Sequence, residues 1–220
     1  MSGILSLLLD VIVLAGLGVT IFYCIRLSTS LNNFRQYRQE FNVLLQDLSQ
    51  NIDKAQNGVV TRGVLLDITA VKGKEWLEAG ETVSIDDLEA AEKAQGVRLE
   101  EGDALCLRLG WYKRRNELGA PASGRPGLHA ETLPWLYERG ISILAADASQ
   151  DAEPSGYPVI GLPIHRVGIV AMGLWLIDNC NLEELAATCQ RLTRYEFQFV
   201  LSPLRMQGGT GSPANPLAIF

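Results

Sequence analysis

Short apolar runs separated by helical or turn-forming segments recur beyond residue 58, and they constrain the fold of this chain more than any other feature. The runs, each as long as a buried strand, lie at residues 59–68, 103–109, 141–146 and 195–201. Between them, Ser84 precedes a helical pattern that stops at Gly96, and a second one over residues 132–139 stops at Gly140. Strands that alternate with helices predict an α/β domain with an at least partly parallel sheet.

Two carboxylates follow predicted strands. Asp67 closes the first apolar run and Asp147 closes the third. Sites in α/β proteins are built at the carboxyl ends of strands, so both are candidate site residues. The polar segments 111–125 and 208–213 are predicted to be loops. The basic cluster at residues 113–115 is interpreted as solvated, with attraction of an anionic substrate as the alternative.

The residues before this domain form a separate module. Residues 4–25 are apolar apart from Asp10, and a run of 22 such residues is long enough to span a bilayer. Arg26 and further arginines follow at once, which places the C-terminal side in the cytoplasm by the positive-inside rule. We therefore predict a transmembrane helix over residues 1–25, a single-pass membrane protein, and a cytoplasmic C-terminal domain.

A heptad pattern continues through residues 26–58. Mostly apolar side chains recur at alternating intervals of four and three residues from Leu27 to Ala55. This pattern predicts a coiled-coil helix and hence a homo-oligomer. The alternative is one amphipathic helix that packs on the chain's own globular domain. The turn signal at Asn57-Gly58 marks the boundary with an α/β domain over residues 59–220.

Composition excludes some classes of function. The net charge of −6 argues against nucleic acid as a partner, because nucleic-acid-binding surfaces are normally basic. The four cysteines have no Cys-x-x-Cys or Cys/His spacing, which predicts reduced thiols and neither disulfides nor a zinc site made of cysteines. The chain has only two histidines, His129 and His165.

The strongest candidate site lies in residues 163–185. His165 stands at the head of an apolar run and Asp178 at its foot. A histidine and an aspartate separated by a buried element can come together in one metal or acid/base site. They can equally be a hydrogen-bonded histidine and a helix-capping aspartate. His129, which precedes a predicted helix, is interpreted as a loop contact.

Six segments of the α/β domain match one known family in the same order. They are Arg62–Asp67, Pro126–His129, Leu133–Gly140, Pro163–His165, Gly173–Asn179 and Gly208–Pro213. Together they resemble the cyclase family, metal-dependent hydrolases that include bacterial kynurenine formamidase. The resemblance implies a swivelling β/β/α-type fold, an oligomer, and hydrolysis of a small-molecule amide with a divalent metal, zinc or manganese. Residues 1–56 resemble a short uncharacterised family of bacterial membrane-anchored proteins, which implies no chemistry.

In the family that the chain resembles, the active site has two halves. The first is a His-x-Gly-Thr-His-x-Asp motif that supplies most metal ligands and the base, and this sequence does not contain it. The second is a histidine followed, after one helix, by an acid, which matches His165 and Asp178. The family more often has glutamate there, one residue closer. The resemblance thus implies a partial cyclase domain with His165 and Asp178 as metal ligands, and it assigns no catalytic or substrate-binding residue.

Two functions follow from these observations. The first is a membrane-anchored amide hydrolase of the kynurenine formamidase type. The second is a non-catalytic scaffold without metal, whose coiled coil oligomerises and whose cyclase-like domain binds a partner. Two ligands bind metal poorly, because catalytic zinc uses three protein ligands and structural zinc four. A site completed by another chain lies between the two. A natural fusion, a decayed enzyme and a misassembled reading frame all fit the sequence.

Overall fold

The computed structural model describes residues 22, 23, 26, 29 and 58–220. Apart from the few described residues before residue 59, the transmembrane helix predicted over residues 1–25 and the coiled coil predicted over residues 26–58 lie outside the described residues, so both stay predictions. Where the structure is described, every helix falls short of the length and apolar character that crossing a bilayer requires.

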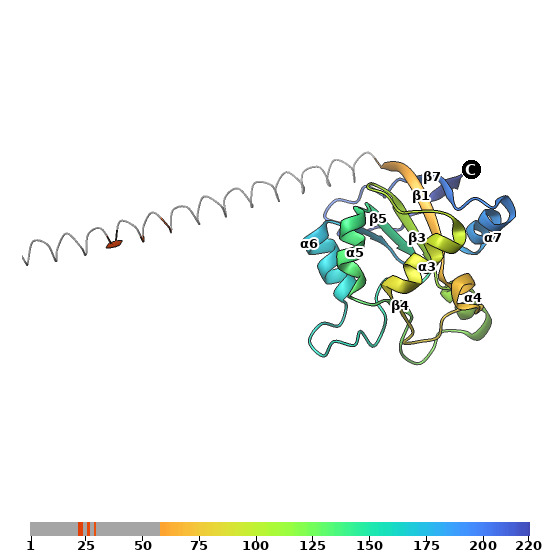
Figure 1. The fold of residues 1–220 in the computed structure, drawn as a ribbon, viewed down its shortest axis with the longest axis horizontal. Helices are drawn as coiled ribbons and strands as arrows, with labels where there is room; N and C mark the ends of the chain where they lie inside the picture. The colour runs from red at the N-terminus through yellow and green to blue at the C-terminus, as the bar shows by residue number, and fades with distance from the viewer. Residues whose placement is uncertain (1–21, 24–25, 27–28, 30–57) are drawn as a thin grey trace, which may run out of the picture. The chain divides into compact units, whose positions relative to one another are not determined.

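A six-stranded mixed sheet forms the centre of the described domain (Figure 1). Its strands are β1 (Val59–Asp67), β3 (Ala104–Arg108), β5 (Ile143–Ala146), β6 (Trp175–Ile177), β7 (Glu196–Leu201) and β8 (Leu217–Ile219). The strand order is β6-β5-β3-β1-β7-β8; the first four are parallel to one another, whereas β7 and β8 each pair antiparallel with the preceding strand in that order. The predicted α/β domain with a partly parallel sheet is therefore confirmed. A small separate sheet pairs β2 (Thr82–Val83) with β4 (Gly127–Leu128).

Both faces of the sheet are buried along most of β1, β3 and β5, which explains why these strands contain continuous apolar runs. Along β1, Leu66 belongs to one core and its neighbour Leu65 to the other. The first core packs under α3 (Ile85–Gln95) and α5 (Thr132–Arg139), and the second packs under α7 (Glu183–Leu192) (Figure 1).

Helix α3 begins where the sequence predicts, because its start is encoded locally. The hydroxyl of Ser84 accepts a hydrogen bond from the backbone N–H of Asp87, and the Asp87 carboxylate accepts one from the backbone N–H of Ser84. This is a capping box. Gly96 ends α3 and Gly140 ends α5, each with a φ of 65°, a left-handed conformation that glycine adopts without strain.

The structure contains regular elements that were not predicted from the sequence. Helix α2 (Ile68–Lys72) follows β1 directly, and α4 (Trp111–Leu118) occupies the first half of the predicted loop 111–125. Strand β8 extends the sheet beyond β7, which was predicted to be the last strand. The loop prediction was therefore wrong for residues 111–118, where Lys113 and Arg114 also contact carboxylates of a preceding loop. Two members of the basic cluster are therefore paired with carboxylates, and the third, Arg115, donates to Oδ1 of Asn179 at 3.1 Å.

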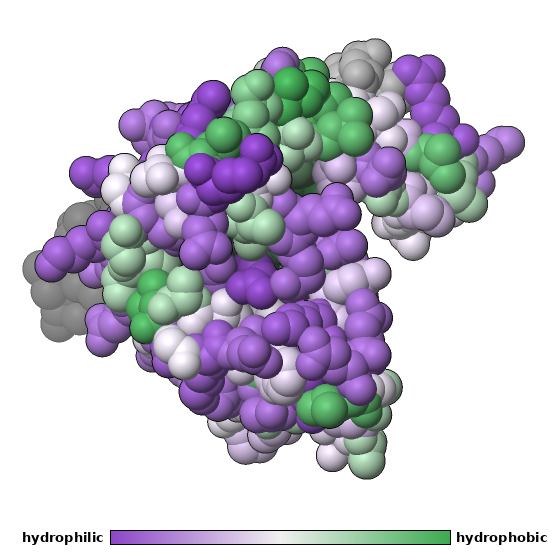
Figure 2. Space-filling model, turned by 90° about the vertical axis from the view of Figure 1, so that its right-hand side faces the viewer, coloured by the Kyte–Doolittle hydropathy of each residue, from purple (hydrophilic) through white to green (hydrophobic). Residues whose placement is uncertain are grey.

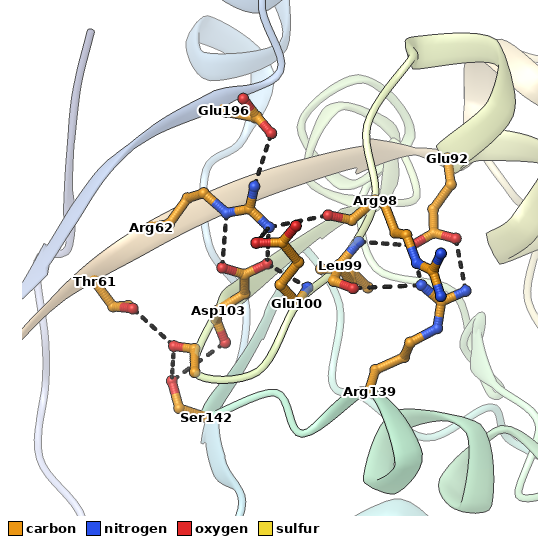
Figure 3. Close-up of polar contacts among 11 residues, drawn as sticks. Thr61, Arg62, Glu92, Arg98, Leu99, Glu100, Asp103, Arg139, Ser142 and Glu196 are labelled. Atoms are coloured by element: carbon orange, nitrogen blue, oxygen red, sulfur yellow. Dashed lines mark hydrogen bonds and ion pairs between the residues drawn. The ribbon is translucent and has the colours of Figure 1, made fainter.

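At the edge of the sheet where β3 and β5 begin, Arg62 is the centre of a polar network (Figure 3). Its Nε and Nη2 donate to the two carboxylate oxygens of Asp103 at 2.9 and 2.7 Å. Its Nη1 donates to Glu196 at 2.9 Å. The Asp103 side chain is only 3% exposed. This network ties β1 to the loop before β3 and to the first residue of β7.

Candidate functional site

His165 and Asp178 lie side by side in the structure. The Nε2 atom of His165 is 3.1 Å from Oδ2 of Asp178. His165 belongs to the π-helix η1 (Ile164–Ile169), which continues into α6 (Val170–Met172), and Asp178 directly follows β6. The chain turns at Gly173, whose φ is 64°. π-helical turns are rare and occur frequently at functional sites.

Asp151 fixes the other side of the His165 ring. Its Oδ2 is 2.5 Å from Nδ1 of His165, and its two oxygens also accept the backbone N–H groups of Ile164 and His165 at 2.6 and 3.2 Å. Asp151 is fully buried. The Asp151 carboxylate thus holds the ring by Nδ1, and Nε2 is the nitrogen that faces Asp178.

Gln150 holds Asp178. Its Nε2 donates to Oδ1 of Asp178 at 3.2 Å and to the backbone carbonyls of Leu144 and Ile177 at 3.3 and 3.0 Å. All three partners are oxygens, which sets the orientation of the amide with its NH2 group toward them. The two carbonyls belong to β5 and β6, so one buried side chain joins both strands to the site carboxylate.

Strand β4 holds the loop that carries Gln150 and Asp151. The backbone N–H of Leu128 donates to the carbonyl of Gln150 at 2.9 Å. A Cβ atom at Gly127 would lie 2.3 Å from the carbonyl carbon of Asp151, closer than real Cβ contacts. Glycine at this position therefore allows the strand to approach the site loop.

The two donors fit one side of a divalent metal site. Two ligands about 2.0–2.1 Å from a tetrahedral zinc lie about 3.3 Å apart, and the observed separation of Nε2 and Oδ2 is 3.1 Å. Imidazole nitrogen and carboxylate oxygen are ligands that both zinc and manganese accept. In the described part of the chain, no group of three or more His, Cys, Asp or Glu residues is arranged to hold a metal ion. In donor type and spacing, the Nε2 atom of His165 and the Oδ2 atom of Asp178 are compatible with two ligands of a divalent metal.

The other carboxylates that the sequence suggested have structural roles. Asp67 accepts a hydrogen bond from the start of α2 and pairs with Arg108 at 3.1 Å. Asp147 accepts the backbone N–H groups of Leu109 at 2.9 Å and Trp111 at 3.0 Å. The strand ends do carry carboxylates as predicted, but Asp67 caps α2 and pairs with Arg108, and Asp147 accepts backbone N–H groups.

Neither His129 nor a described cysteine belongs to the candidate site formed by His165 and Asp178. Nδ1 of His129 accepts the backbone N–H of Glu131 at 3.4 Å, a loop contact as predicted. Of the described cysteines, Cys106, Cys180 and Cys189 are free thiols, and burial raises the pKa of Cys180 to about 12 and that of Cys189 to about 11. Thiols held in the protonated form are poor nucleophiles.

Asp147 is expected to make stability depend on pH. Burial raises the pKa of its carboxyl from 3.8 to about 7. Between these values the folded state keeps a proton that the unfolded state has released, so raising the pH favours unfolding. Between about pH 4 and about pH 7, the free energy of unfolding should therefore fall more steeply with pH in the wild type than in Asp147→Asn. The difference between the two slopes should be up to about 1.4 kcal/mol per pH unit. Urea unfolding of both chains across this range measures it, and parallel curves would contradict it.

Gln150 and Asp151 belong to no motif that identifies them in the sequence. Their only signal is position: they lie in the loop that follows β5, at the carboxyl end of a parallel strand. The same rule selected Asp147, a few residues earlier in that loop.

The segment that carries His165 exposes several apolar side chains together with the charged Arg166. Val167, Ile169 and Val170 are 37%, 49% and 80% exposed, and Val159 in the preceding loop is 88% exposed. Figure 2 shows one face of the molecule, where hydrophobic side chains gather in separate groups among hydrophilic ones. Exposed apolar residues in the segment that carries His165 are of the kind that take part in contacts with other molecules.

Comparisons with known proteins place the chain among cyclases. The Cyclase family model matches residues 34–151, more than half of the chain; the match begins within the segment predicted as coiled coil and ends at Asp151. The crystal structure of a novel cyclase superimposes with a TM-score of 0.69 and 32% identity, covering 77% of this chain and 57% of that one. A search of the curated proteins found no match.

Two isatin hydrolases share the fold. Isatin hydrolase A from Ralstonia solanacearum has a TM-score of 0.55 and 21% identity, covering 71% of this chain and 59% of that one. Isatin hydrolase A from Labrenzia aggregata, bound to benzyl benzoate, has a TM-score of 0.55 and 22% identity, covering 74% and 60%. The chain thus spans about three fifths of the length of these solved structures. The match of the family model to more than half of the sequence shows that the chain belongs to the cyclase family.

Proposed function

We propose that the chain is a subunit of a metal-dependent hydrolase that cleaves the carbon–nitrogen bond of a small amide, of the kynurenine formamidase type. In this proposal the α/β domain is part of a swivelling β/β/α cyclase fold. The observation that carries it is the 3.1 Å separation of His165 Nε2 and Asp178 Oδ2, with each side chain held by a buried partner. Hydrogen-bond support of both donors is typical of metal ligands. Two neighbours with this fold are named isatin hydrolases, which also supports hydrolysis.

His165 and Asp178 would hold the ion, either zinc or manganese. A bound divalent ion would supply Lewis acidity toward an amide carbonyl and a bound water. Asp151 binds Nδ1, which leaves Nε2 as the ring nitrogen that would bind the ion beside Oδ2 of Asp178. The side chains of His165 and Asp178 are 25% and 33% exposed, so a small substrate reaches them from solvent.

The remaining metal ligand is proposed to come from a second chain of an oligomer. Catalytic zinc uses three protein ligands, and the described residues supply two. The exposed apolar residues of η1 and α6 beside His165 suit such a contact. Attachment to the membrane through residues 4–25, with the domain in the cytoplasm, is part of the same proposal.

The alternative is a non-catalytic scaffold without metal. It is favoured by the small number of donors: outside the pair formed by His165 and Asp178, the described residues provide no additional ligand at the site. The two proposals differ in a measurable way, because only the hydrolase needs His165.

An assay on N-formylkynurenine with the full-length chain and added zinc or manganese tests the hydrolase. Turnover is expected with metal. Loss of a partner that merely orients a metal ligand costs about 10–100-fold, so His165→Ala should lower kcat/KM by at least about 100-fold. His129→Ala, which removes the only other histidine, is the matched control and should leave turnover unchanged. Absence of turnover with either metal would contradict the hydrolase and favour the scaffold.

A further inference from the structure

Gln150 is a buried polar side chain whose position needs an explanation. It is 1% exposed, and its Nε2 group makes three contacts to oxygens, one of them to Asp178. Its own Oε1 is buried and accepts no hydrogen bond from the described residues. Leaving such an acceptor unsatisfied costs about 1–3 kcal/mol. An apolar side chain of similar size would avoid this cost. The hydrogen bonds that Nε2 donates therefore explain why a glutamine occupies this buried position.

Asp178 depends on Gln150 for its orientation. The carboxylate follows the short strand β6 and is 33% exposed, so it can turn toward solvent. Its hydrogen-bonding contacts with other side chains are Gln150 on Oδ1 and His165 on Oδ2. Because Gln150 is itself bonded to the carbonyls of Leu144 and Ile177, it fixes Oδ1 relative to the sheet. With Oδ1 held, Oδ2 faces Nε2 of His165.

We propose that Gln150 is a positioning residue of the metal site: it holds the carboxylate of Asp178 so that Oδ2 and His165 Nε2 converge on one ion. The presence of an ion in this inference rests on the proposed function. The placement of Asp178 by Gln150 rests on the structure alone. Gln150 touches neither the substrate nor the ion. It acts through Asp178.

The test compares Gln150→Leu with Gln95→Leu in the full-length chain. Gln95 is a matched control, because its amide also joins two backbone groups, the carbonyl of Leu65 and the N–H of Asp67. The first measurement uses metal-free protein with 15N-labelled histidine. The signal of the His165 Nε2 should move in Gln150→Leu and stay in Gln95→Leu, and the signals of His129 should stay in both. Gln150→Glu keeps the size of the side chain and replaces its donors by an acceptor, so it should also move the signal of the His165 Nε2. This variant replaces Gln150→Leu in the test if the leucine variant does not fold.

The second measurement is the affinity for Co²⁺, followed by its visible absorption. Gln150→Leu should weaken binding by about 10–100-fold, the range found when a partner that orients a metal ligand is lost, and Gln95→Leu should leave it unchanged. In an Asp178→Ala background, Gln150→Leu should cause no further shift of His165, because its effect passes through Asp178.

The outcomes separate the two proposals. If the wild type binds no Co²⁺ while the His165 signal moves in Gln150→Leu, the metal site fails and the positioning of Asp178 stands. If the wild type binds Co²⁺ and Gln150→Leu changes neither the His165 signal nor the affinity, the positioning role is overturned and the metal site stands.

Discussion

Replacing Arg62 by leucine is expected to lower the free energy of unfolding of the α/β domain by about 3–5 kcal/mol. Asp103 would lose both charge-assisted hydrogen bonds from the guanidinium, at 2.9 and 2.7 Å, and would remain buried at 3% exposure (Figure 3). A buried carboxylate without its cation is one of the few changes that cost this much. Urea unfolding of both chains at constant pH measures the difference.

Two further variants control this prediction. Lys113→Met removes an ion pair of 3.6 Å to Glu75, which is 69% exposed, and should change stability by no more than about 1 kcal/mol. The double variant Arg62→Leu/Asp103→Leu removes both charges and should be more stable than Arg62→Leu alone. If Arg62→Leu and Lys113→Met lowered the free energy of unfolding equally, the network centred on Arg62 would stabilise the domain no more than a surface ion pair does.

The parts of the fold that could be predicted from the sequence have local causes. Strand β1 was predicted within a residue of its observed bounds, because its buried part, with Val64, Leu65 and Leu66, is a continuous apolar run. Helix α3 was predicted because Ser84 and Asp87 form a complete cap within four residues. Helix α4 was missed because part of its support comes from outside the helix: Arg114 bonds to Glu78 in a preceding loop.

The residues of the candidate site likewise fall into those that could be found from the sequence and those that could not. His165 and Asp178 could be found by their resemblance to a family pattern. Asp151 and Gln150 could not, because each reaches its partner only after folding: Asp151 contacts a histidine 14 residues away, and Gln150 contacts an aspartate 28 residues away. The approach of β4 at Gly127, which places their loop, depends on a long-range contact.

Removing His165 is expected to have the largest effect on the proposed metal site. The ring supplies one of the two donors, and Asp151, buried beneath it, would be left without its histidine partner. Because loss of an orienting partner alone weakens metal binding by about 10–100-fold, loss of the ligand itself should weaken it by at least about 100-fold. Asp178→Ala should act in the same direction. His129→Ala should bind metal like the wild type, since His129 contacts Glu131 in a loop.

The most direct measurement is a calorimetric titration of the full-length, metal-free chain with Zn²⁺ and with Mn²⁺, alongside the His165→Ala and His129→Ala variants. Saturable binding of at least one of these ions by the wild type and by His129→Ala, with binding lost or at least about 100-fold weaker in His165→Ala, is the predicted result. No saturable binding of either ion by the wild type, or equal affinity in His165→Ala, would contradict the assignment of His165 and Asp178 as metal ligands.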